Sequence, residues 1–87
     1  MQHRLKTWRA IFDAMWVGLK TFEFRRNDRD FSTGDTLLLQ EWNEVEEIYT
    51  CRTIRAVVTY TLSGPAFGIP EGYCIMAISI YDRTDNA

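Results

Sequence analysis

The chemically richest part of the sequence is residues 18–25, Gly-Leu-Lys-Thr-Phe-Glu-Phe-Arg. The alternation over residues 21–26 predicts a strand with Phe22 and Phe24 in the core. Its other face then carries the polar side chains Thr21, Glu23 and Arg25, with Lys20 at the mouth of the strand. The cations can donate to a phosphate or carbonyl while the carboxylate accepts from an amine or amide edge, which suits a base or nucleotide. The alternative is a solvated strand face whose exposed ion pairs contribute about 0–1 kcal/mol each.

Further candidate ligand contacts lie along the chain. Residues 26–30 alternate in charge, so Arg26 and Arg29 could grip a phosphate as a flexible rim, or pair with the aspartates of a solvated loop. Trp42 stands at the end of a predicted strand and Tyr73 at the start of another, where aromatic rings often stack on bases. Ordinary partial burial of both rings is the alternative.

Catalysis finds fewer candidates. Lys20 with Thr21 and Glu71 could form a lysine, threonine and glutamate amidohydrolase set. His3 is a candidate general base, although it has no triad context, and the chain contains neither a GxSxG motif nor a glycine-rich phosphate loop. A surface or hydrogen-bonded histidine is the alternative.

No metal site or cofactor is expected, because one histidine and two cysteines do not supply the four ligands of a zinc centre. Cys51 and Cys74 lie in or beside strand-like sequence, so we expect free, partly buried thiols in a reducing compartment. A disulfide is the alternative.

The elements that would position these residues can be read along the chain. We expect a short strand at 3–6, then a helix capped by Thr7 and ended by Gly18. The apolar residues of this helix follow helical spacing and form one stripe: Trp8, Ile11, Phe12, Met15, Trp16 and Leu19. We expect Trp8 and Trp16 of this stripe to lie in the core. Strands follow at 21–26, 35–42, 52–62 and 73–81, with an acidic turn at 43–47 and a frayed tail at 82–87.

These elements predict an α+β domain: a small mixed barrel or curled sheet of about five strands with one N-terminal amphipathic helix. Its 87 residues make one domain, and dimerisation would be an easy way to add stability. The net charge of −2 argues against coating long stretches of nucleic acid and leaves a local patch or one recognised nucleotide. No stretch approaches about 18 apolar residues and no secretory h-region is present, so a cytoplasmic protein outside the membrane is expected.

The pattern Gly18-x-Lys20-x-x-Glu23-x-Arg25 after a short helix resembles the GxKxxExR signature of the ASCH domain, a member of the PUA-like β-barrel superfamily. The longer run over residues 20–31, the Gly-Asp at 34–35 and the Glu-Gly-Tyr at 71–73 are similar to a family of short bacterial and phage ASCH-like proteins. This resemblance covers the chain from about residue 3 to residue 80.

The resemblance implies a PUA-like barrel whose cleft, between helix and sheet, is lined by Lys20, Glu23 and Arg25. ASCH domains are generally proposed to bind RNA or modified nucleotides. One branch, the bacterial acetylcytidine amidohydrolases, uses a lysine, a threonine and a glutamate. Lys20 matches that lysine, whereas Glu23 stands at the position of the threonine and Glu71 is only a loose substitute for the glutamate.

The leading hypothesis is therefore a domain that binds RNA or a nucleotide-type ligand. A second is a small amidohydrolase that acts on an acetylated nucleoside through Lys20, with Thr21 or Glu23 and Glu71. A third is a phage or bacterial module that binds another protein.

Overall fold

The computed structural model describes residues 1–86, which form one helix and one five-stranded sheet. The elements follow in the order β1 (Gln2–Trp8), α1 (Arg9–Trp16), β2 (Phe22–Arg26), β3 (Thr36–Asn43), β4 (Ile48–Ser63) and β5 (Tyr73–Asp85). The strands lie side by side as β1-β3-β4-β5-β2, with β1 parallel to β3 and the other neighbours antiparallel. The prediction of about five strands and one N-terminal helix is confirmed.

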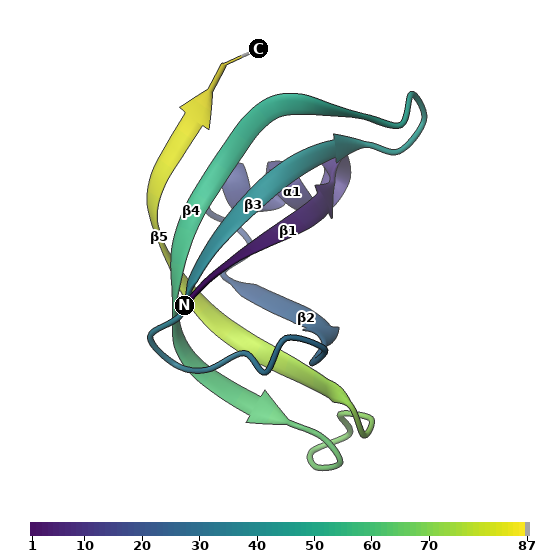
Figure 1. The fold of residues 1–87 in the computed structure, drawn as a ribbon, viewed down its shortest axis with the longest axis vertical. Helices are drawn as coiled ribbons and strands as arrows, with labels where there is room; N and C mark the ends of the chain where they lie inside the picture. Colours follow the sequence, from purple (N-terminus) through teal and green to yellow (C-terminus); the bar gives the residue numbers. More distant parts are fainter. Residues whose placement is uncertain (87) are drawn as a thin grey trace.

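The sheet curls strongly, and β4 and β5 run along its whole height (Figure 1). Their pairing shifts register between Arg55 and Ala56 and again between Val58 and Tyr60. Such irregularities bend a strand and increase its twist. As a result the sheet forms a half-barrel in which its two edge strands, β1 and β2, come within reach of each other's side chains.

The core fills the concave side of the sheet beneath the helix. Alternate residues of the strands point inward, as the burial pattern of β1 shows, and α1 adds Phe12 and Met15, both fully buried. The strand contribution is aliphatic for the most part and includes Leu5, Leu37, Leu39, Ile54, Val58 and Met76. Among residues 1–86 no helix has the length and apolar character that a bilayer crossing requires.

The helix is shorter than predicted, with eight residues, or about two turns. Thr7 does not cap it: the cap position is Trp8, which makes no side-chain capping bond, and Thr7 is a buried residue of β1. Gly18 ends the helix as predicted, with φ +84°. The amide of Gly18 donates to the Met15 carbonyl at 3.0 Å and the amide of Leu19 to the Ala14 carbonyl at 2.9 Å. This is a Schellman ending, which requires a left-handed residue.

Three aromatic residues were wrongly assigned to the core. Trp8 is 58% exposed because β1 continues to this residue and its even-numbered positions face outward. Phe22 and Phe24 of β2 are 46% and 48% exposed, whereas Glu23 between them is only 3% exposed. Alternation defines two faces but not which one is inside. Here Phe22 lies under the Lys20 ammonium and Phe24 stacks on Tyr73 on the outside of the sheet.

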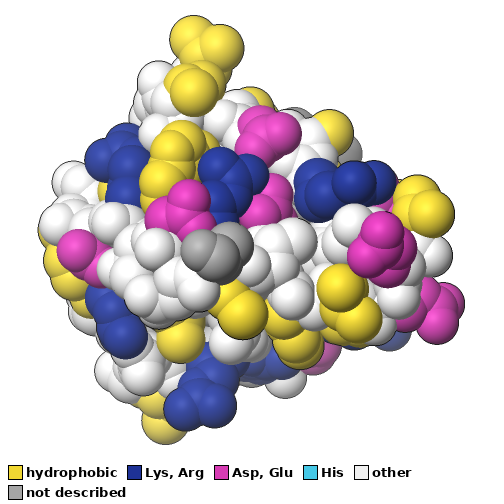
Figure 2. Space-filling model, turned by 90° about the horizontal axis from the view of Figure 1, so that it is seen from above, with side chains coloured by type: hydrophobic (Ala, Val, Ile, Leu, Met, Phe, Trp, Pro, Cys, Tyr) yellow, Lys and Arg dark blue, Asp and Glu magenta, His cyan; other side chains and the backbone are white. Residues whose placement is uncertain are grey.

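The chain end is more ordered than predicted, because residues 82–85 extend β5 and pair with Arg52–Arg55 of β4. Residues 82–85 therefore do not form a frayed tail, and the amide of Asn86 donates to the carbonyl of Cys51 at 3.2 Å. Residue 87, the last of that prediction, lies outside the described part of the chain. Both thiols are free as predicted, but only Cys74 is buried, whereas Cys51 is exposed. On the face seen from above, basic and acidic side chains are intermixed with apolar ones (Figure 2), in keeping with the net charge of −2.

Candidate ligand site at the seam between the edge strands

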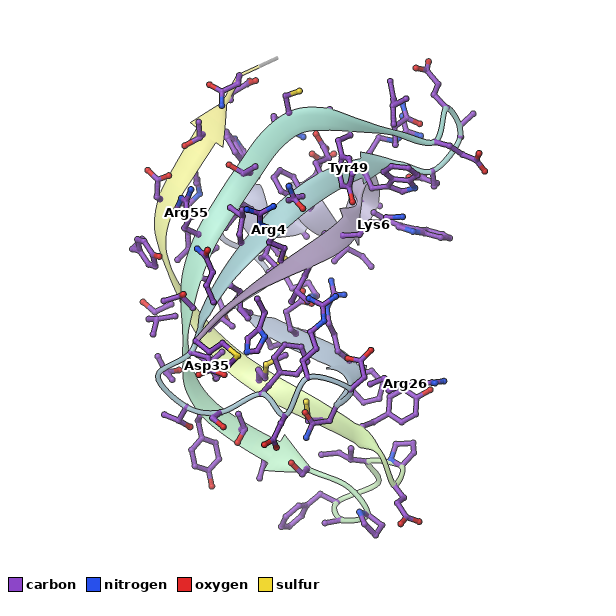
Figure 3. All side chains as sticks on the ribbon, viewed as in Figure 1. Arg4, Lys6, Arg26, Asp35, Tyr49 and Arg55 are labelled. Carbon is purple, nitrogen blue, oxygen red and sulfur yellow. The ribbon has the colours of Figure 1, made fainter. Side chains whose placement is uncertain are left out.

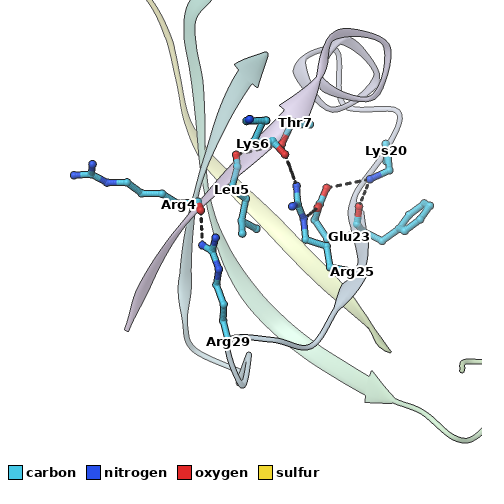
Figure 4. A network of polar contacts seen from close by, with 9 residues as sticks. Arg4, Leu5, Lys6, Thr7, Lys20, Glu23, Arg25 and Arg29 are labelled. Carbon is cyan, nitrogen blue, oxygen red and sulfur yellow. Dashed lines mark hydrogen bonds and ion pairs between the residues drawn. The ribbon is translucent and has the colours of Figure 1, made fainter. Parts of the chain in front are cut away.

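The seam is the space between β1 and β2, the two edges of the half-barrel. Sheet edges present unpaired backbone groups. Arg25 on β2 donates from Nη2 to the carbonyl of Lys6 at 2.9 Å, and Arg29 donates to the carbonyl of Arg4. These two carbonyls are two residues apart and so point to the same side of β1. Side chains, rather than a ladder of backbone bonds, thus connect the two edges (Figure 4).

At the seam, Glu23 is a buried carboxylate held by two cations. Lys20 Nζ lies 3.2 Å from Oε1 of Glu23, and Arg25 Nε lies 2.6 Å from Oε2. Lys20 also donates to the carbonyl of Phe22 at 2.6 Å, and Arg25 donates to the hydroxyl of Thr7 at 3.3 Å. Each carboxylate oxygen therefore has its own cationic donor, and the triad carries one net positive charge.

The local sequence explains this placement. The Schellman ending at Gly18 reverses the chain, so that Lys20 lies two residues before the start of β2. The carbonyl of Thr21 accepts from the amide of Ile78 at 3.1 Å, which fixes the start of the strand. The period of β2 then puts Glu23 and Arg25 on its inner face, opposite Met76 and Cys74 of β5.

A pocket of about 270 Å³ opens between this triad and the start of the helix. We name it the Trp8 pocket; its lining is Lys6, Thr7, Trp8, Ile11, Lys20, Glu23 and Arg25. Trp8 and Ile11 give it an apolar wall, and both are largely exposed, at 58% and 45%. The pocket thus combines an accessible indole ring with one fixed carboxylate and two lysine ammonium groups.

A second pocket, of about 240 Å³, lies on the other side of Arg25. We name it the arginine pocket; its lining is Leu5, Arg25, Arg26, Asp28 and Arg29. Three arginines and one aspartate line it, so the formal charge of its lining is +2. Arg26 comes from the outer face of β2, where its guanidinium lies over the Tyr73 ring, 5.9 Å from the centroid. Arg25 is the residue that the two pockets share.

The structure thus brings together Lys20, Glu23 and Arg25 in one pocket and Arg26 and Arg29 in the other. The two predicted stacking residues line neither. Trp42 packs edge-on against Tyr49, with ring centroids 4.9 Å apart, and its ring lies 3.9 Å from Lys6 Nζ. Tyr73 is stacked on Phe24 on the outer face, with ring centroids 5.6 Å apart.

The predicted hydrolase set assembles only in part: Lys20 and Glu23 meet at the seam, but Thr21 and Glu71 do not join them. Lys20 precedes one end of β2, and Glu71 precedes Tyr73, which pairs with the other end. The five residues between these ends span roughly 17 Å at about 3.4 Å per residue. Thr21 is exposed and lines neither pocket. Lys20 and Glu71 are therefore too far apart to act on one bond.

Sequence reasoning missed the apolar wall of the Trp8 pocket. Trp8 and Ile11 were assigned to the buried stripe of the helix because their spacing suits one. A signal was available in the alternation of residues 3–8, His-Arg-Leu-Lys-Thr-Trp, which continues as far as Trp8 and matches the burial pattern of β1. Read as one strand, it places Lys6 and Trp8 outside and Thr7 inside.

Comparison of the sequence with known proteins identifies a family. The model of a domain of unknown function, DUF3850, matches residues 2–78. The chain belongs to the DUF3850 family. It is also 40% identical over 57 residues to an uncharacterized 12.9 kDa protein in the GpA 3′ region of Escherichia phage P2, a match that covers 66% of this chain and 50% of the phage protein. The chain thus aligns with half the length of this relative. The resemblance to ASCH and PUA-like domains stays a prediction.

A second polar cluster in this DUF3850 domain ties the helix to the sheet. Arg52 on β4 donates from Nε and Nη2 to the two carboxylate oxygens of buried Glu41, at 2.8 and 2.6 Å, and from Nη2 to Asp13 of α1 at 2.6 Å. Its guanidinium lies over the rings of Phe12 and Trp16. The bonds from Arg52 lower the pKa of the Glu41 carboxyl. The cluster lines neither pocket, so we assign it to stability.

His3, the candidate general base, is also structural. It is buried, and its Nε2 lies 2.8 Å from Oδ2 of Asp35, which also accepts from the amide of Ser32 at 3.1 Å. The pair holds the start of β1 against the loop before β3, away from both pockets. Within residues 1–86 no group of three or more histidine, cysteine, aspartate or glutamate side chains could hold a metal ion.

Proposed function

We propose that this DUF3850 domain binds a nucleotide-type ligand, free or within RNA, with its base in the Trp8 pocket. The observation that carries the proposal is the pairing of an exposed tryptophan ring with a buried, immobilised carboxylate in one pocket. The ASCH resemblance, which implies a PUA-like barrel and a ligand at Lys20, Glu23 and Arg25, supports the same ligand class.

The Trp8 ring and the Glu23 carboxylate suit the flat face and the polar edge of a nucleobase. Every base has a flat π face, and a ring such as that of Trp8 can stack on it, with a contribution of about 1–3 kcal/mol. The edge of a base carries amine and imide hydrogens, which an ionised carboxylate accepts, as glutamate does from the exocyclic amine of cytosine. Glu23 has about four lone-pair sites and uses two for Lys20 and Arg25, so it can accept further bonds.

The pocket is also pre-organised and small. Lys20 and Arg25 fix the carboxylate before any ligand arrives, so less conformational freedom is lost on binding. Its volume of about 270 Å³ lies just below the range of about 300–1,000 Å³ for pockets that take drug-sized ligands. A pocket of this size suits one base, in agreement with a chain whose net charge of −2 offers no polycationic surface.

Calorimetric titration with the four common nucleotides, acetylcytidine and short single-stranded RNAs tests the proposal. The decisive pair of variants is Trp8→Ala and Trp42→Ala, because these residues are partners in the β1–β3 register and only Trp8 lines the pocket. We expect Trp8→Ala to weaken binding by about 5- to 150-fold, the equivalent of one stacked base, and Trp42→Ala to leave it within about twofold. An absence of binding at millimolar ligand, or equal affinities of wild type, Trp8→Ala and Glu23→Gln, would refute the proposal.

A further inference from the structure

We infer that the arginine pocket is the phosphate subsite of the same ligand, so that this domain recognises a phosphorylated nucleotide unit rather than a free nucleoside or base. This inference rests on the proposed function, because it takes the base to lie in the Trp8 pocket. The two pockets lie on either side of Arg25, which lines both. A base in one and a phosphate in the other would thus be joined across a single side chain.

The charge of the arginine pocket matches a phosphate. Its lining includes Arg25, Arg26 and Arg29 and one acidic residue, Asp28. A phosphate monoester carries about −1.5 to −2 charges near neutral pH, and a phosphodiester carries about −1. Arginine is well suited to either group because its planar fork can bond two phosphate oxygens at once. The formal charge of +2, of which Arg25 shares its part with Glu23, therefore complements one phosphate, not a series of them.

Two of these guanidinium groups are already held in place by the seam. The hydrogen bonds of Arg25 to Glu23, Lys6 and Thr7 use three of its five N–H donors, and the bond of Arg29 to the Arg4 carbonyl uses one. The other donors remain for a ligand, on groups whose rotamers the protein has already fixed. Such pre-organisation lowers the entropic cost of binding an anion.

The arrangement also predicts a shallow salt dependence. The observed affinity for single-stranded nucleic acid falls with salt with a slope of about −0.7 for each phosphate contacted, on logarithmic axes. One phosphate in the arginine pocket gives a slope near −0.7, whereas a groove that follows several phosphates gives a slope several times steeper. A dinucleotide and an RNA hexamer should therefore have similar slopes.

The test compares a nucleoside, its 5′- and 3′-monophosphates and inorganic phosphate by calorimetry, on the wild type and three variants. Arg26→Ala is the decisive variant because Arg26 takes no part in the bonds between β1 and β2, and Arg29→Ala supports it. Arg55→Ala is the control, because it removes the same charge on β4, well away from Arg26 (Figure 3). Far-UV circular dichroism and thermal melting verify that each variant is folded.

We expect one monophosphate isomer to bind the wild type at least 10-fold more tightly than the nucleoside. This gain should fall below threefold in Arg26→Ala and persist in Arg55→Ala, while nucleoside affinity stays unchanged in both. Equal binding of nucleoside and both monophosphates to the wild type would overturn the phosphate subsite and leave the proposed function standing. So would an equal loss of the gain in Arg26→Ala and Arg55→Ala. If inorganic phosphate alone binds, and Arg26→Ala abolishes it, the anion site stands and the proposed nucleotide function is overturned.

Discussion

Replacing Glu23 with glutamine should lower the free energy of unfolding by about 2–3 kcal/mol. The carboxylate is 3% exposed and accepts from Lys20 on one oxygen and from Arg25 on the other. Glutamine keeps the shape of the side chain but removes its charge, and it turns one of the two acceptors into an NH₂ donor that faces a cation. The link between β1 and β2 through Arg25 would lose its anchor.

The magnitude follows from how far the pair is removed from water. Breaking a fully buried ion pair costs about 3–5 kcal/mol, whereas exposed pairs contribute about 0–1 kcal/mol. The carboxylate is buried, but the side chains of Lys20 and Arg25 keep 19% and 25% of their exposure, so part of their charge remains solvated. A value between these limits is expected. For a domain of this size each kcal/mol shifts the melting temperature by about 4–8 °C, which gives a fall of roughly 10–20 °C.

Urea and thermal unfolding followed by far-UV circular dichroism measure this loss. Glu71→Gln is the matched control, because it makes the same change of charge in an exposed loop and should stay within about 0.5 kcal/mol of the wild type. If Glu23→Gln proves no more destabilising than Glu71→Gln, the carboxylate does not anchor the seam. The bonds from Arg25 to Lys6 and Thr7 would then suffice to hold the edges.

Three further predictions concern the rest of the fold. Arg52→Ala leaves the buried carboxylate of Glu41 without its bidentate donor and should cost about 3–5 kcal/mol in urea unfolding. The hydrogen bond from His3 lowers the pKa of the Asp35 carboxyl. The ionised Asp35 therefore stabilises the fold fully above the ordinary aspartate pKa of about 3.9, and this stabilisation is lost as the pH falls through the lowered pKa. Asp35→Asn should accordingly flatten the fall of stability below about pH 4. The native Cys51 thiol should react with a disulfide reagent at the rate of an exposed thiol, whereas Cys74, whose pKa burial raises, should react only on unfolding.

Each of these predictions has a counterpart that should behave differently. Arg55→Ala, three residues further along β4 and outside the Glu41 cluster, should change stability by less than about 1 kcal/mol. Asp30→Asn, in the exposed loop before Asp35, leaves the bond between His3 and Asp35 in place, so the acid limb that depends on Asp35 should persist. Labelling of both native thiols at equal rates would contradict the buried position of Cys74. An Arg52→Ala protein as stable as Arg55→Ala would show that the cluster contributes little.

The period of the sequence was enough to predict the elements but not their orientation. Changes from helical spacing to alternation located α1 and the five strands to within a few residues at most boundaries, because each period follows from backbone geometry. The prediction of which side chains of β2 face inward was wrong. Phe22 and Phe24 are more apolar than Glu23, and hydrophobicity alone favours burying them. Tertiary contacts reverse this preference, because Lys20 and Arg25 neutralise the carboxylate of Glu23 at the seam.

The candidate site was also predictable only in part, because local sequence fixes contacts within one strand but not contacts between distant strands. The spacing of Lys20, Glu23 and Arg25 follows from one short strand, so local sequence could bring them together. Trp8 reaches the pocket only because β1 and β2, far apart in the sheet order, meet when the sheet curls. No local pattern encodes that meeting, since it depends on the bends of β4 and β5.

Because one set of residues both links the edge strands and lines the proposed site, stability and binding should be coupled here. A ligand that bonds Glu23 or Arg25 in the folded state only must raise the free energy of unfolding by RT ln(1 + [L]/Kd), about 2.7 kcal/mol at a hundredfold excess over Kd. Substitutions in the Glu41 and Arg52 cluster would lower stability without changing Kd, since that cluster lines neither pocket. Substitutions at Glu23 should change both quantities together. Measuring stability and affinity on the same variants therefore separates residues that support the fold alone from those that also meet the ligand.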